Sequence, residues 1–533
     1  MLYALPLLAP LVLVLAAWFA FAGPQFRPRT GVKLAELATL VALGVAIATA
    51  FVLVFYGAGS SPMFGVSMLG LSTRVDMLSV VMLLLVASVG WVVVRFSSTY
   101  LDGEARQGSF TGWMCLTLAS VLLLVQAGSL AMLVGAWMAT SLFLHKLLLF
   151  YPQRVQAQRA ARKKFLISRL GDVALIGAAV LLTASFGTGN IAGILADARD
   201  GAADLNGWLA PAIAGLLALA AVLKSAQFPT HGWLTEVMET PTPVSALLHA
   251  GVVNAGGFLL IRFADVMLLS PAVLAVLVMV GGFTALLGGL VMLTQPAVKT
   301  SLAWSTVGQM GFMIFQCGLA LFPLALLHIV AHSLYKAHAF LASGSAVEGV
   351  ASIKRPGPVA IPGGGAVGRA FLLALAIYAL VATSFGLLFG FDTKSPQAIA
   401  LGAILIFGVA YLIAQGLADK APWALTRRTA LFSVGAAISY FALQTLAEWM
   451  MTGTVSATLP ATPAPGPLEW ALIVLAVLSF GLVSVAQAMF PLWAYHPSAA
   501  GLRVHLSNGL YANAVFDRML AGAQAGYQKE TSS

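Results

Sequence analysis

Charged residues are scarce in this chain. Asp, Glu, Lys and Arg make up 9% of its 533 residues, and hydrophobic residues make up 60%. Soluble domains average about 25% charged residues, so this composition excludes an ordinary soluble protein. Long apolar runs are abundant instead, and a membrane-spanning helix needs roughly 20 apolar residues. The sequence therefore predicts an all-α polytopic membrane protein.

Cysteine and cofactor motifs are also lacking. The two cysteines, Cys115 and Cys317, fall in apolar segments, and the absence of a CxxC pair excludes an iron–sulfur or zinc site of that type. A glycine pattern from Gly363 to Gly368 fits a dinucleotide fingerprint, but it follows a Pro-rich loop where the fingerprint needs a strand. We interpret it as a linker and expect neither a cofactor nor catalysis in this chain.

About fifteen segments are long and apolar enough to span a membrane. The first has neither a basic region nor a small-residue cleavage site, which favours a retained helix over a signal peptide. The segments lie near residues 1–22, 34–57, 75–96, 110–127, 128–151, 167–186, 207–224, 243–264, 271–293, 300–320, 322–345, 370–391, 397–417, 429–450 and 468–492.

The net charge of +10 is distributed unevenly between the loops. Basic residues gather in every second loop and in the tail, which is the positive-inside pattern of membrane proteins. This pattern predicts a protein of the inner (cytoplasmic) membrane whose N-terminus lies outside and whose tail is cytoplasmic. The basic residues of the loops expected inside are Arg27, Arg29, Lys33, Arg106, Arg154, Arg159, Arg162, Lys163, Lys164, Lys354, Arg355, Arg369, Lys420, Arg427 and Arg428.

One lysine stands where an apolar helix meets a helix breaker. Lys224 ends the apolar run that begins at Trp208, and Phe228-Pro229 follows within a few residues. A charge at membrane depth is costly and is seldom kept without a role. Broken helices occur within membranes only where the backbone lines a cavity or is buried in protein. The combination predicts an ion pathway.

Other ionisable residues fall within the predicted spans. His328, His332 and Lys336 are spaced four residues apart, so they lie on one face of a helix. Imidazole titrates near neutrality and can both take and give a proton, and a desolvated lysine releases its proton more readily than a solvated one. We therefore predict a proton path. Its candidate residues are His145, Lys146, Asp172, Lys224, His249, His328, His332 and Lys336.

Plainer roles stay open for several of these residues. A membrane histidine is often a hydrogen-bonded packing residue, and His328 with His332 could also bind a metal, although the glutamate of a zincin motif is missing. Lys146 could be an interfacial lysine whose head group reaches the membrane surface. Asp172 could simply pair with Arg169, one turn before it.

Several long motifs resemble one family. They are similar to signature stretches of the antiporter-like membrane subunits, which include the large antiporter-like subunit of respiratory complex I, subunits of Mrp sodium–proton antiporters, and DabB. The resemblance implies N-terminal transmembrane helices at 1–74, an antiporter-like core at 75–420, C-terminal transmembrane helices at 421–494 and a cytoplasmic tail at 495–533. The matching stretches are Ser168–Asp172, Lys224–Pro229, Trp233–Leu234, Pro241–Ala250, Lys299 with Ala303–Thr306, and His328–Ser345.

The resemblance also implies a fold with two inverted five-helix units, each with a broken helix. Lys224 matches the ionisable residue at the first break. Gly390–Lys394 resembles the second break, although the segment count places Lys394 in an outside loop. By position, the central proton path would consist of Lys224, His249, Lys336 and Lys394, with His328 and His332 linking its middle.

One departure from the family distinguishes this chain. Family members usually have a glutamate after the tryptophan of the fifth segment, paired with the lysine at the break, but here Met138 follows Trp137. Such an anion would favour the charged form of Lys224. His145 lies two turns further along nearly the same face, so the path could be rewired through His145 and Lys146.

The departure, the small tail and the short chain after the last span resemble DabB, the membrane half of a two-part complex that accumulates inorganic carbon. The resemblance implies a soluble DabA-like zinc partner on the cytoplasmic face. We expect this partner to contact the basic loop Arg154–Lys164 and the tail from His496 to Lys529, with binding of anionic lipid as the alternative role of the loop. The conducted ion would be the proton, because a sodium site needs carboxylates and the spans offer mainly Asp172.

Three alternatives remain. The chain could be a proton-pumping subunit of a respiratory NADH–quinone oxidoreductase-like or hydrogenase complex, although the missing glutamate weighs against this. It could be a cation/proton antiporter subunit. It could also be an inactive membrane anchor, although an anchor has no reason to keep costly charges within its spans.

Overall fold

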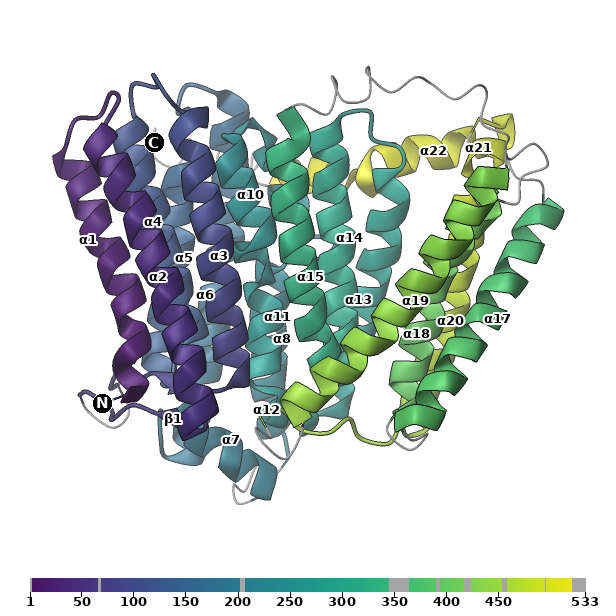
Figure 1. Ribbon diagram of the computed structural model, residues 1–533, viewed down its shortest axis with the longest axis horizontal. Coiled ribbons are helices and arrows are strands. Elements are labelled where there is room, and N and C mark those ends of the chain that lie inside the picture. Colours follow the sequence, from purple (N-terminus) through teal and green to yellow (C-terminus); the bar gives the residue numbers. More distant parts are fainter. Residues whose placement is uncertain are drawn as a thin grey trace, which may run out of the picture.

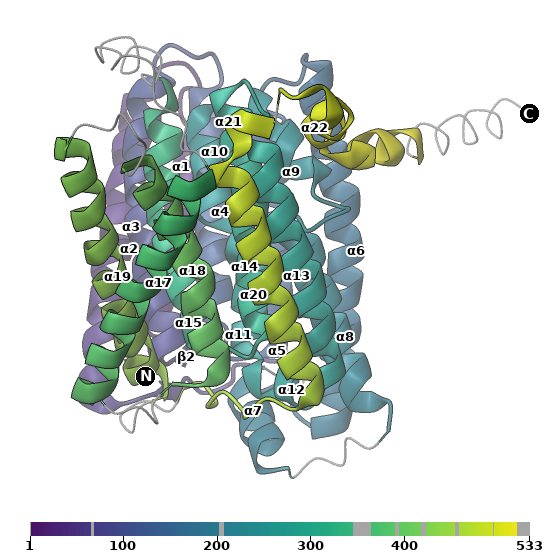
Figure 2. The ribbon, with the colours of Figure 1, turned by 90° about the vertical axis from the view of Figure 1, so that its right-hand side faces the viewer.

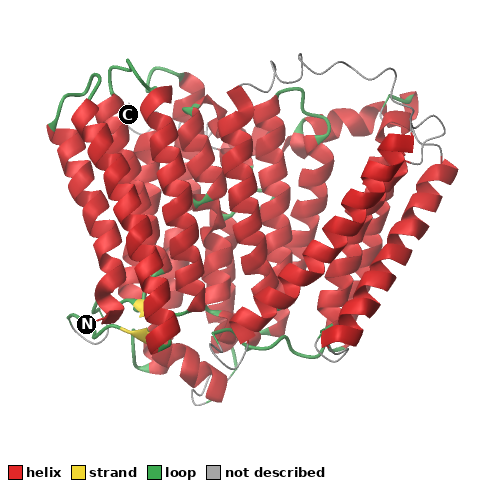
Figure 3. Cartoon of the chain, in the orientation of Figure 1, coloured by secondary structure: helices red, strands yellow, loops and turns green. Residues whose placement is uncertain are grey.

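The computed structural model describes residues 2–65, 69–201, 207–344, 364–389, 394–416, 423–452, 458–493 and 495–519. Within these residues the chain is a bundle of long helices that run up and down side by side (Figure 1). Figure 3 shows that helices dominate, with a small strand pair beside the N-terminus. The strands β1 (Gly59–Ser60) and β2 (Arg74–Val75) are antiparallel and pair Gly59 with Val75.

The helices follow the predicted segments closely. The first half comprises η1 (Leu2–Leu7), α1 (Leu8–Ala22), α2 (Arg29–Tyr56), α3 (Met77–Tyr100), α4 (Gln107–Val125), α5 (Leu130–Leu148), α6 (Val155–Phe186), α7 (Ile191–Asp200), α8 (Leu209–Lys224), α9 (Gly232–Glu236), η2 (Val237–Glu239), α10 (Thr242–Ala250), η3 (Val252–Asn254), α11 (Ala255–Arg262) and α12 (Ala264–Leu268). The second half comprises α13 (Pro271–Met292), α14 (Val298–Gly318), α15 (Phe322–Leu341), η4 (Ala342–Gly344), α17 (Gly364–Phe389), α18 (Pro396–Gly416), α19 (Trp423–Thr452), α20 (Pro467–Ala488), α21 (Phe490–Trp493), η6 (Pro497–Ala499), α22 (Ala500–Ser507) and η7 (Gly509–Tyr511).

The prediction of an all-α polytopic membrane protein is confirmed. In the described part of the chain, twelve helical segments are long and apolar enough to cross a membrane, and two shorter apolar helices lie at Leu209–Lys224 and Pro396–Gly408. With α14, which has 21 residues, these segments account for all the predicted spans. One of them, Thr242–Arg262, is α10 and α11 joined through η3.

The two ends of the bundle differ. The N-terminus lies at one end, together with α7 and α12, and α21 and α22 lie across the opposite end (Figure 1). We call these the N-terminal end and the tail end. The loops that follow α3 and α5 reach the tail end, so Arg106 and Arg154 lie on the same side as α22. This distribution matches the alternation of basic loops in the sequence.

The bundle has one main core and a smaller side group of helices. Buried side chains from α1 through α15 form one continuous hydrophobic cluster. The helices α17 to α20 pack in two further clusters beside α13, α14 and α15. Figure 2 shows this side group in front of the core helices. Because α1 and α2 share the main core with α3 and α4, the predicted boundary at residue 74 does not coincide with a break in packing.

Two glycines allow α13 and α14 to touch backbone to backbone. A Cβ atom on Gly281 would lie 2.4 Å from the backbone N of Phe315, and one on Gly311 would lie 2.5 Å from the backbone N of Ala285. Small residues at helix crossings are how membrane helices approach closely, since lipid provides no hydrophobic drive between them. The contact fixes α14 as a wall beside α15, which carries the histidines.

A buried ion pair ties α3 to α11 near the N-terminal end. Asp76 caps α3 by accepting a hydrogen bond from the backbone N–H of Ser79 at 2.9 Å. Its carboxylate also pairs with Arg262 and, at 2.6 Å, with Arg74. Burial alone would raise the pKa of Asp76, but the two guanidinium charges outweigh burial and hold that pKa well below its usual value.

The second predicted break, at Gly390–Lys394, falls between the end of one described helix and the start of the next. Gly390 to Thr393 lie outside the described residues, α17 ends at Phe389, and α18 begins at Pro396. The helices run antiparallel, because Tyr378 donates to the carbonyl of Ile399 at 2.9 Å while the ring of Phe371 lies 5.8 Å from that of Phe407. Lys394 therefore lies beside a helix start at the N-terminal end, in agreement with the segment count.

Candidate functional site

The first predicted break is present, and its first three residues, Ser225 to Gln227, are buried. α8 ends at Lys224, and α9 resumes at Gly232. The backbone between them is held by side chains: Ser225 donates to the carbonyl of Val253 at 2.9 Å, and the backbone N–H of Phe228 donates to Thr284 at 3.2 Å. These contacts satisfy backbone hydrogen-bonding groups that would otherwise bond within a continuous helix.

Lys224 contacts neutral groups of α5. Its Nζ donates to the Ser141 hydroxyl at 3.1 Å and to the Trp137 carbonyl at 3.4 Å. It also lies 4.4 Å from the centre of the Trp137 ring, where the negative face of the ring attracts a cation. Met138, one residue further along α5, leaves the lysine without the carboxylate that family members usually provide.

A second lysine that the sequence analysis assigned to a basic loop joins this site. Lys164 lies on α6, is 3% exposed, and donates to the carbonyl of Ser141 at 2.7 Å. Ser141 thus contacts one lysine through its carbonyl and another through its hydroxyl. The predicted loop Arg154–Lys164 is mostly helix, because α6 begins at Val155, and the burial of Lys164 follows from its place on the inward face.

Asp172 provides the nearest negative charge. It forms an ion pair with Arg169 at 2.6 Å on α6, which is the plainer role considered from the sequence. Its charge also acts on both Lys224 and Lys164. The carboxylate therefore partly replaces the missing glutamate, from α6 rather than from α5.

A second group of ionisable residues lies on α10 and α15. His249 is fully buried, with its ring stacked on Phe340 at 4.3 Å. Lys336 is also fully buried, and its Nζ donates to the Leu302 carbonyl of α14 at 3.1 Å. The charge of Lys336 acts on His249 and on His332. The structure brings these predicted residues together.

His328 and His332 face a large cavity. Their rings lie 5.9 Å apart, as expected for neighbours on one helix face, and both line a cavity of about 580 Å³ between α13, α14, α15 and the side group of helices. In the part of the chain that the structure describes, the Nε2 atoms of both histidines have no hydrogen-bond partner. A water occupies about 30 Å³, so the cavity has room for a chain of water molecules.

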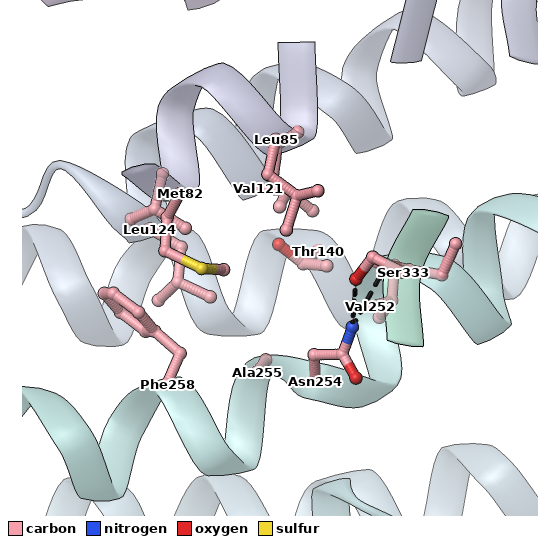
Figure 4. Close-up of a pocket in the computed structure, with 14 residues that line it drawn as sticks. Met82, Leu85, Val121, Leu124, Thr140, Val252, Asn254, Ala255, Phe258 and Ser333 are labelled. Atoms are coloured by element: carbon pink, nitrogen blue, oxygen red, sulfur yellow. Dashed lines mark hydrogen bonds between the residues drawn. The ribbon is translucent and has the colours of Figure 1, made fainter. Parts of the chain in front are cut away.

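A polar contact lies between the two groups. Asn254 in η3 donates to the Ser333 hydroxyl at 2.8 Å and to the carbonyl of Ala250 at 3.0 Å. Figure 4 shows this pair at the edge of a small pocket, with Thr140 of α5 across from it. Asn254 and Ser333 therefore connect the helix of His249 with the helix of Lys336.

His145 and Lys146 are placed differently. His145 lines a surface cavity with Arg162 and Phe165 toward the tail end. Lys146 is exposed, and its Nζ lies 5.9 Å from the Trp113 ring. This is the arrangement of the interfacial alternative, and it separates Lys146 from the buried groups.

Lys394 is separated from the other candidates as well. Its Nζ lies 3.8 Å from the centre of the Phe441 ring and has no hydrogen-bond partner within the described ranges. Together with Glu448 it lines a cavity of about 380 Å³ at the N-terminal end. Burial lowers the pKa of Lys394, and the charge of Glu448 opposes that change. The sequence analysis missed Glu448, although a carboxylate inside the apolar run 429–450 was a visible signal.

The C-terminal tail docks on this chain near the break. Lys163, the neighbour of Lys164, has no exposed surface and pairs with Glu236 at 2.6 Å and with Asp517 at 2.7 Å. Burial raises the pKa of the Glu236 carboxyl, and the Lys163 ammonium opposes that change. Asn513 also donates to Thr235 of α9 at 3.3 Å. The tail thus contacts α9, the helix that follows the break.

Two family models match the chain. One describes the transmembrane part of NADH:quinone oxidoreductase and Mrp antiporter subunits and covers residues 127–355. The other describes the N-terminus of chain 5 of NADH-ubiquinone oxidoreductase, complex I, and covers residues 64–111. Both matches include parts of the main core.

Similar proteins and structures point in the same direction. A probable inorganic carbon transporter subunit DabB2 of Halothiobacillus neapolitanus is 36% identical over 87% of this chain and 82% of its own length. A probable inorganic carbon transporter subunit DabB of Hydrogenovibrio crunogenus is 41% identical over 53% of this chain and 54% of its own length.

Among solved structures, the Mrp complex from Dietzia sp. DQ12-45-1b aligns with a TM-score of 0.64 at 24% identity, covering 97% of this chain and 59% of that chain. This alignment supports the fold. The chain therefore belongs to the family of antiporter-like, cation-translocating membrane subunits that includes DabB and the Mrp and complex I subunits.

Proposed function

We propose that this chain is the proton-conducting, energy-coupling membrane subunit of a two-component complex that accumulates inorganic carbon. The observation that carries the proton part is the pair of buried lysines, Lys224 and Lys336, with His249 within reach of the charge of Lys336 and with His328 and His332 beside a cavity. The carbon part is supported by relatives named as inorganic carbon transporter subunits, one of which matches over 87% of this chain.

The proposed path runs through groups that can each hold a proton. A proton from the N-terminal end would reach the cavity of His328 and His332 and then the buried group of Lys336 and His249. Asn254 donates to Ser333 on the helix of Lys336, and its neighbour Val253 accepts a hydrogen bond from Ser225 of the break. In order from the N-terminal end, the proposed residues are Lys394, His328, His332, Lys336, His249, Lys224 and His145, with Asp172 acting on Lys224 by its charge.

Neutral partners around Lys224 favour release of its proton. A carboxylate in contact with an ammonium stabilises the charged form, whereas the Ser141 hydroxyl and the Trp137 carbonyl provide weaker stabilisation. The positive charge of Arg169 on α6 adds repulsion. A lysine in this setting can load and unload during each cycle. The arrangement differs from the glutamate–lysine pair of the respiratory subunits, which weighs against a role as a redox-driven pump.

The soluble partner would carry the carbon chemistry. We propose a DabA-like zinc subunit that hydrates CO2 to bicarbonate at the tail end, which would face the cytoplasm. One charge that crosses a membrane supplies about 2.3 kcal/mol per 100 mV. Because a tenfold gradient corresponds to about 1.4 kcal/mol, each proton could sustain a gradient of roughly 40-fold per 100 mV. This is sufficient to drive accumulation without ATP.

The test is complementation of a strain that requires high CO2, with the partner gene supplied alongside. Lys224→Ala and Lys336→Ala should each abolish growth in air, because each removes a proton carrier, while membrane insertion is maintained. Lys146→Ala is the matched control and should grow normally, since that lysine is exposed. Growth of both path variants in air would exclude the proposal.

Purification of the tagged chain from its own cells identifies the complex. We expect a soluble zinc-containing subunit to co-purify, and zinc should be measured in that subunit. Recovery of quinone-oxidoreductase or hydrogenase subunits in its place would assign the chain to a redox complex.

A further inference from the structure

The helix α19 carries a stripe of polar residues along one face. None of these residues belongs to the proposed proton path. Tyr440, Gln444 and Glu448 are spaced four residues apart, so their side chains lie on one face of the helix. The residues between them include exposed apolar side chains that face the surroundings of the bundle, such as Leu443 and Leu446. An ionisable residue kept within such a helix marks a functional site.

The stripe is internally connected. The Gln444 side chain is 1% exposed and donates from Nε2 to Glu448 Oε1 at 3.1 Å. Among the described residues, the Gln444 Oε1 and the Tyr440 hydroxyl have no hydrogen-bond partner. Buried polar groups that lack a protein partner are usually satisfied by ordered water. The stripe therefore has the composition of a water-supported hydrogen-bond chain.

Each end of the stripe opens into a cavity. Glu448 lines the cavity of about 380 Å³ at the N-terminal end, together with Lys394. Tyr440 lines the cavity of about 580 Å³, together with His328 and His332. The stripe therefore extends from a space at the end of the bundle to the space that the histidines face.

The two cavities share a wall. Leu324, in the first turn of α15, lines both of them and is 2% exposed. It lies four residues before His328 and eight before His332, on the face that carries both histidines. One leucine side chain therefore stands between the space around Glu448 and the space around the histidines.

We propose that Glu448, Gln444 and Tyr440 transfer protons between the N-terminal end of the bundle and the His328–His332 pair, with Leu324 as the constriction. This inference rests on the proposed proton conduction. Glu448 takes a proton from water in the cavity at the N-terminal end and releases it to a water molecule beside Gln444. Gln444 holds that water in place. The Tyr440 hydroxyl accepts a proton from this water and passes its own proton on. His328 Nε2 receives the proton that Tyr440 releases.

Proton conduction by the reconstituted complex tests the proposal. The full chain with its co-purified partner is placed in liposomes, a potassium diffusion potential is applied, and proton uptake is followed with a pH-sensitive dye. Glu448→Gln should lower the proton flux at least about tenfold, since a positioned proton-transfer group typically contributes about 100-fold or more to a rate. Tyr440→Phe and Gln444→Leu should each lower it severalfold.

A matched control lies at the same end of the bundle. Glu469, in the first turn of α20, lines a different cavity. Glu469→Gln should leave the flux within about twofold, as surface substitutions usually do. Leu324→Ala should raise the flux, because a smaller side chain widens the constriction, and this result separates a path from a purely structural role of α19.

Thiol labelling gives a readout that does not depend on conduction. The native cysteines, Cys115 and Cys317, are fully buried, so the background is low. Glu448→Cys should react with a membrane-impermeant charged thiol reagent applied from the N-terminal side. Leu446→Cys, on the exposed apolar face of the same helix, should not react.

The outcomes are distinguishable. If the wild-type complex does not conduct protons, the proposed function fails. If the wild type conducts and Lys336→Ala does not, but Glu448→Gln conducts within about twofold of the wild type, the proposed function stands and the α19 path is wrong. An unreactive Glu448→Cys in a folded complex would also overturn the path.

Discussion

The ammonium group of Lys224 donates to the hydroxyl of Ser141 at 3.1 Å, three residues along α5 from Met138. Family members usually carry a glutamate at the position of Met138. In this chain the contact is neutral, and the compensating charge comes from Asp172 at a greater distance. Because Asp172 is itself paired with Arg169, Lys224 is held less firmly in its charged form than a direct carboxylate partner would hold it.

Restoring the missing carboxylate should slow conduction. Met138→Glu places an anion on the helix that Lys224 contacts, and a close opposite charge stabilises the ammonium form by 1.4–4 kcal/mol, or about one to three pKa units. Release of the proton from Lys224 then becomes the slow step. We expect the proton flux of reconstituted complex to fall at least about tenfold.

The isosteric amide isolates the effect of charge. Met138→Gln has nearly the same shape as Met138→Glu but carries no charge, so it should conduct close to the wild-type rate. Equal loss in both variants would show that the size of the side chain, and not its charge, determines the effect. A flux above wild type in Met138→Glu would contradict the role assigned to the neutral site.

Stability should depend on the buried pair of Asp76 and Arg262. Asp76→Ala removes the cap of α3 and leaves a guanidinium group that is 1% exposed without its partner. Breaking one side of a buried pair typically costs 3–5 kcal/mol. We expect a clear drop in the unfolding temperature of detergent-purified protein. Asp102→Ala, which breaks the exposed pair with Arg27 at 3.5 Å, should cost at most about 1 kcal/mol.

The contribution of the Asp76–Arg262 pair to stability should persist in mild acid. The pKa of Asp76 is held well below its usual value, and a carboxyl with a lowered folded-state pKa loses its contribution to stability only as the pH falls through that lowered pKa. The stability difference between the wild type and Asp76→Ala should therefore be unchanged between pH 8 and about pH 5. A difference that disappears over this interval would contradict the assignment.

Most of the fold followed from the sequence because one physical rule dominates it. A backbone in lipid must satisfy its own hydrogen bonds, so each long apolar run must be a helix. The break after Lys224 was predictable for the same reason, since a lysine followed by Phe228-Pro229 cannot continue a buried apolar helix. The contacts of the buried lysine were not predictable, because Ser141 and Trp137 carry no signal of their own.

The errors have a common cause. Lys163 and Lys164 stand in a dense basic stretch, and density of charge was interpreted as exposure, whereas α6 extends far enough to turn both inward. Glu448 was not predicted because it lies outside the motifs that carry the family resemblance. Which side of a helix a charge faces depends on tertiary packing, and sequence spacing alone does not determine it. The roles of the path residues remain predictions.

Carbon uptake should depend on the ion gradient. The chain is proposed to couple proton entry to the partner's chemistry, so a protonophore should abolish bicarbonate accumulation in cells whose ATP level is held constant. Sodium ionophores should have little effect, because the buried groups of the path are lysines and histidines, which suit protons. Accumulation that survives collapse of both the proton and the sodium gradients would exclude gradient coupling.

The last prediction concerns the tail and follows from the place of Lys163 between two carboxylates. Lys163 Nζ lies 2.6 Å from Glu236 of α9 and 2.7 Å from Asp517 of the tail. Lys163→Met removes the shared cation and leaves the two carboxylates to repel each other. Hydrogen bonds to charged groups contribute about 1.5–3 kcal/mol each, and the partial exposure of both acids reduces this value.

We therefore expect the tail of Lys163→Met to detach, with severalfold faster trypsin cleavage at Arg503 and Arg518. Lys146→Met, an exposed lysine away from the tail contacts, should be cleaved like the wild type.

Partner binding then separates two roles of the tail. If deletion from Leu502 onward releases the soluble subunit but Lys163→Met retains it, the tail itself binds the partner. If both variants release the subunit, the partner binds the tail only when it is docked beside α9. If the deletion retains the subunit, the tail is not part of the interface, and its contact with α9 serves this chain alone.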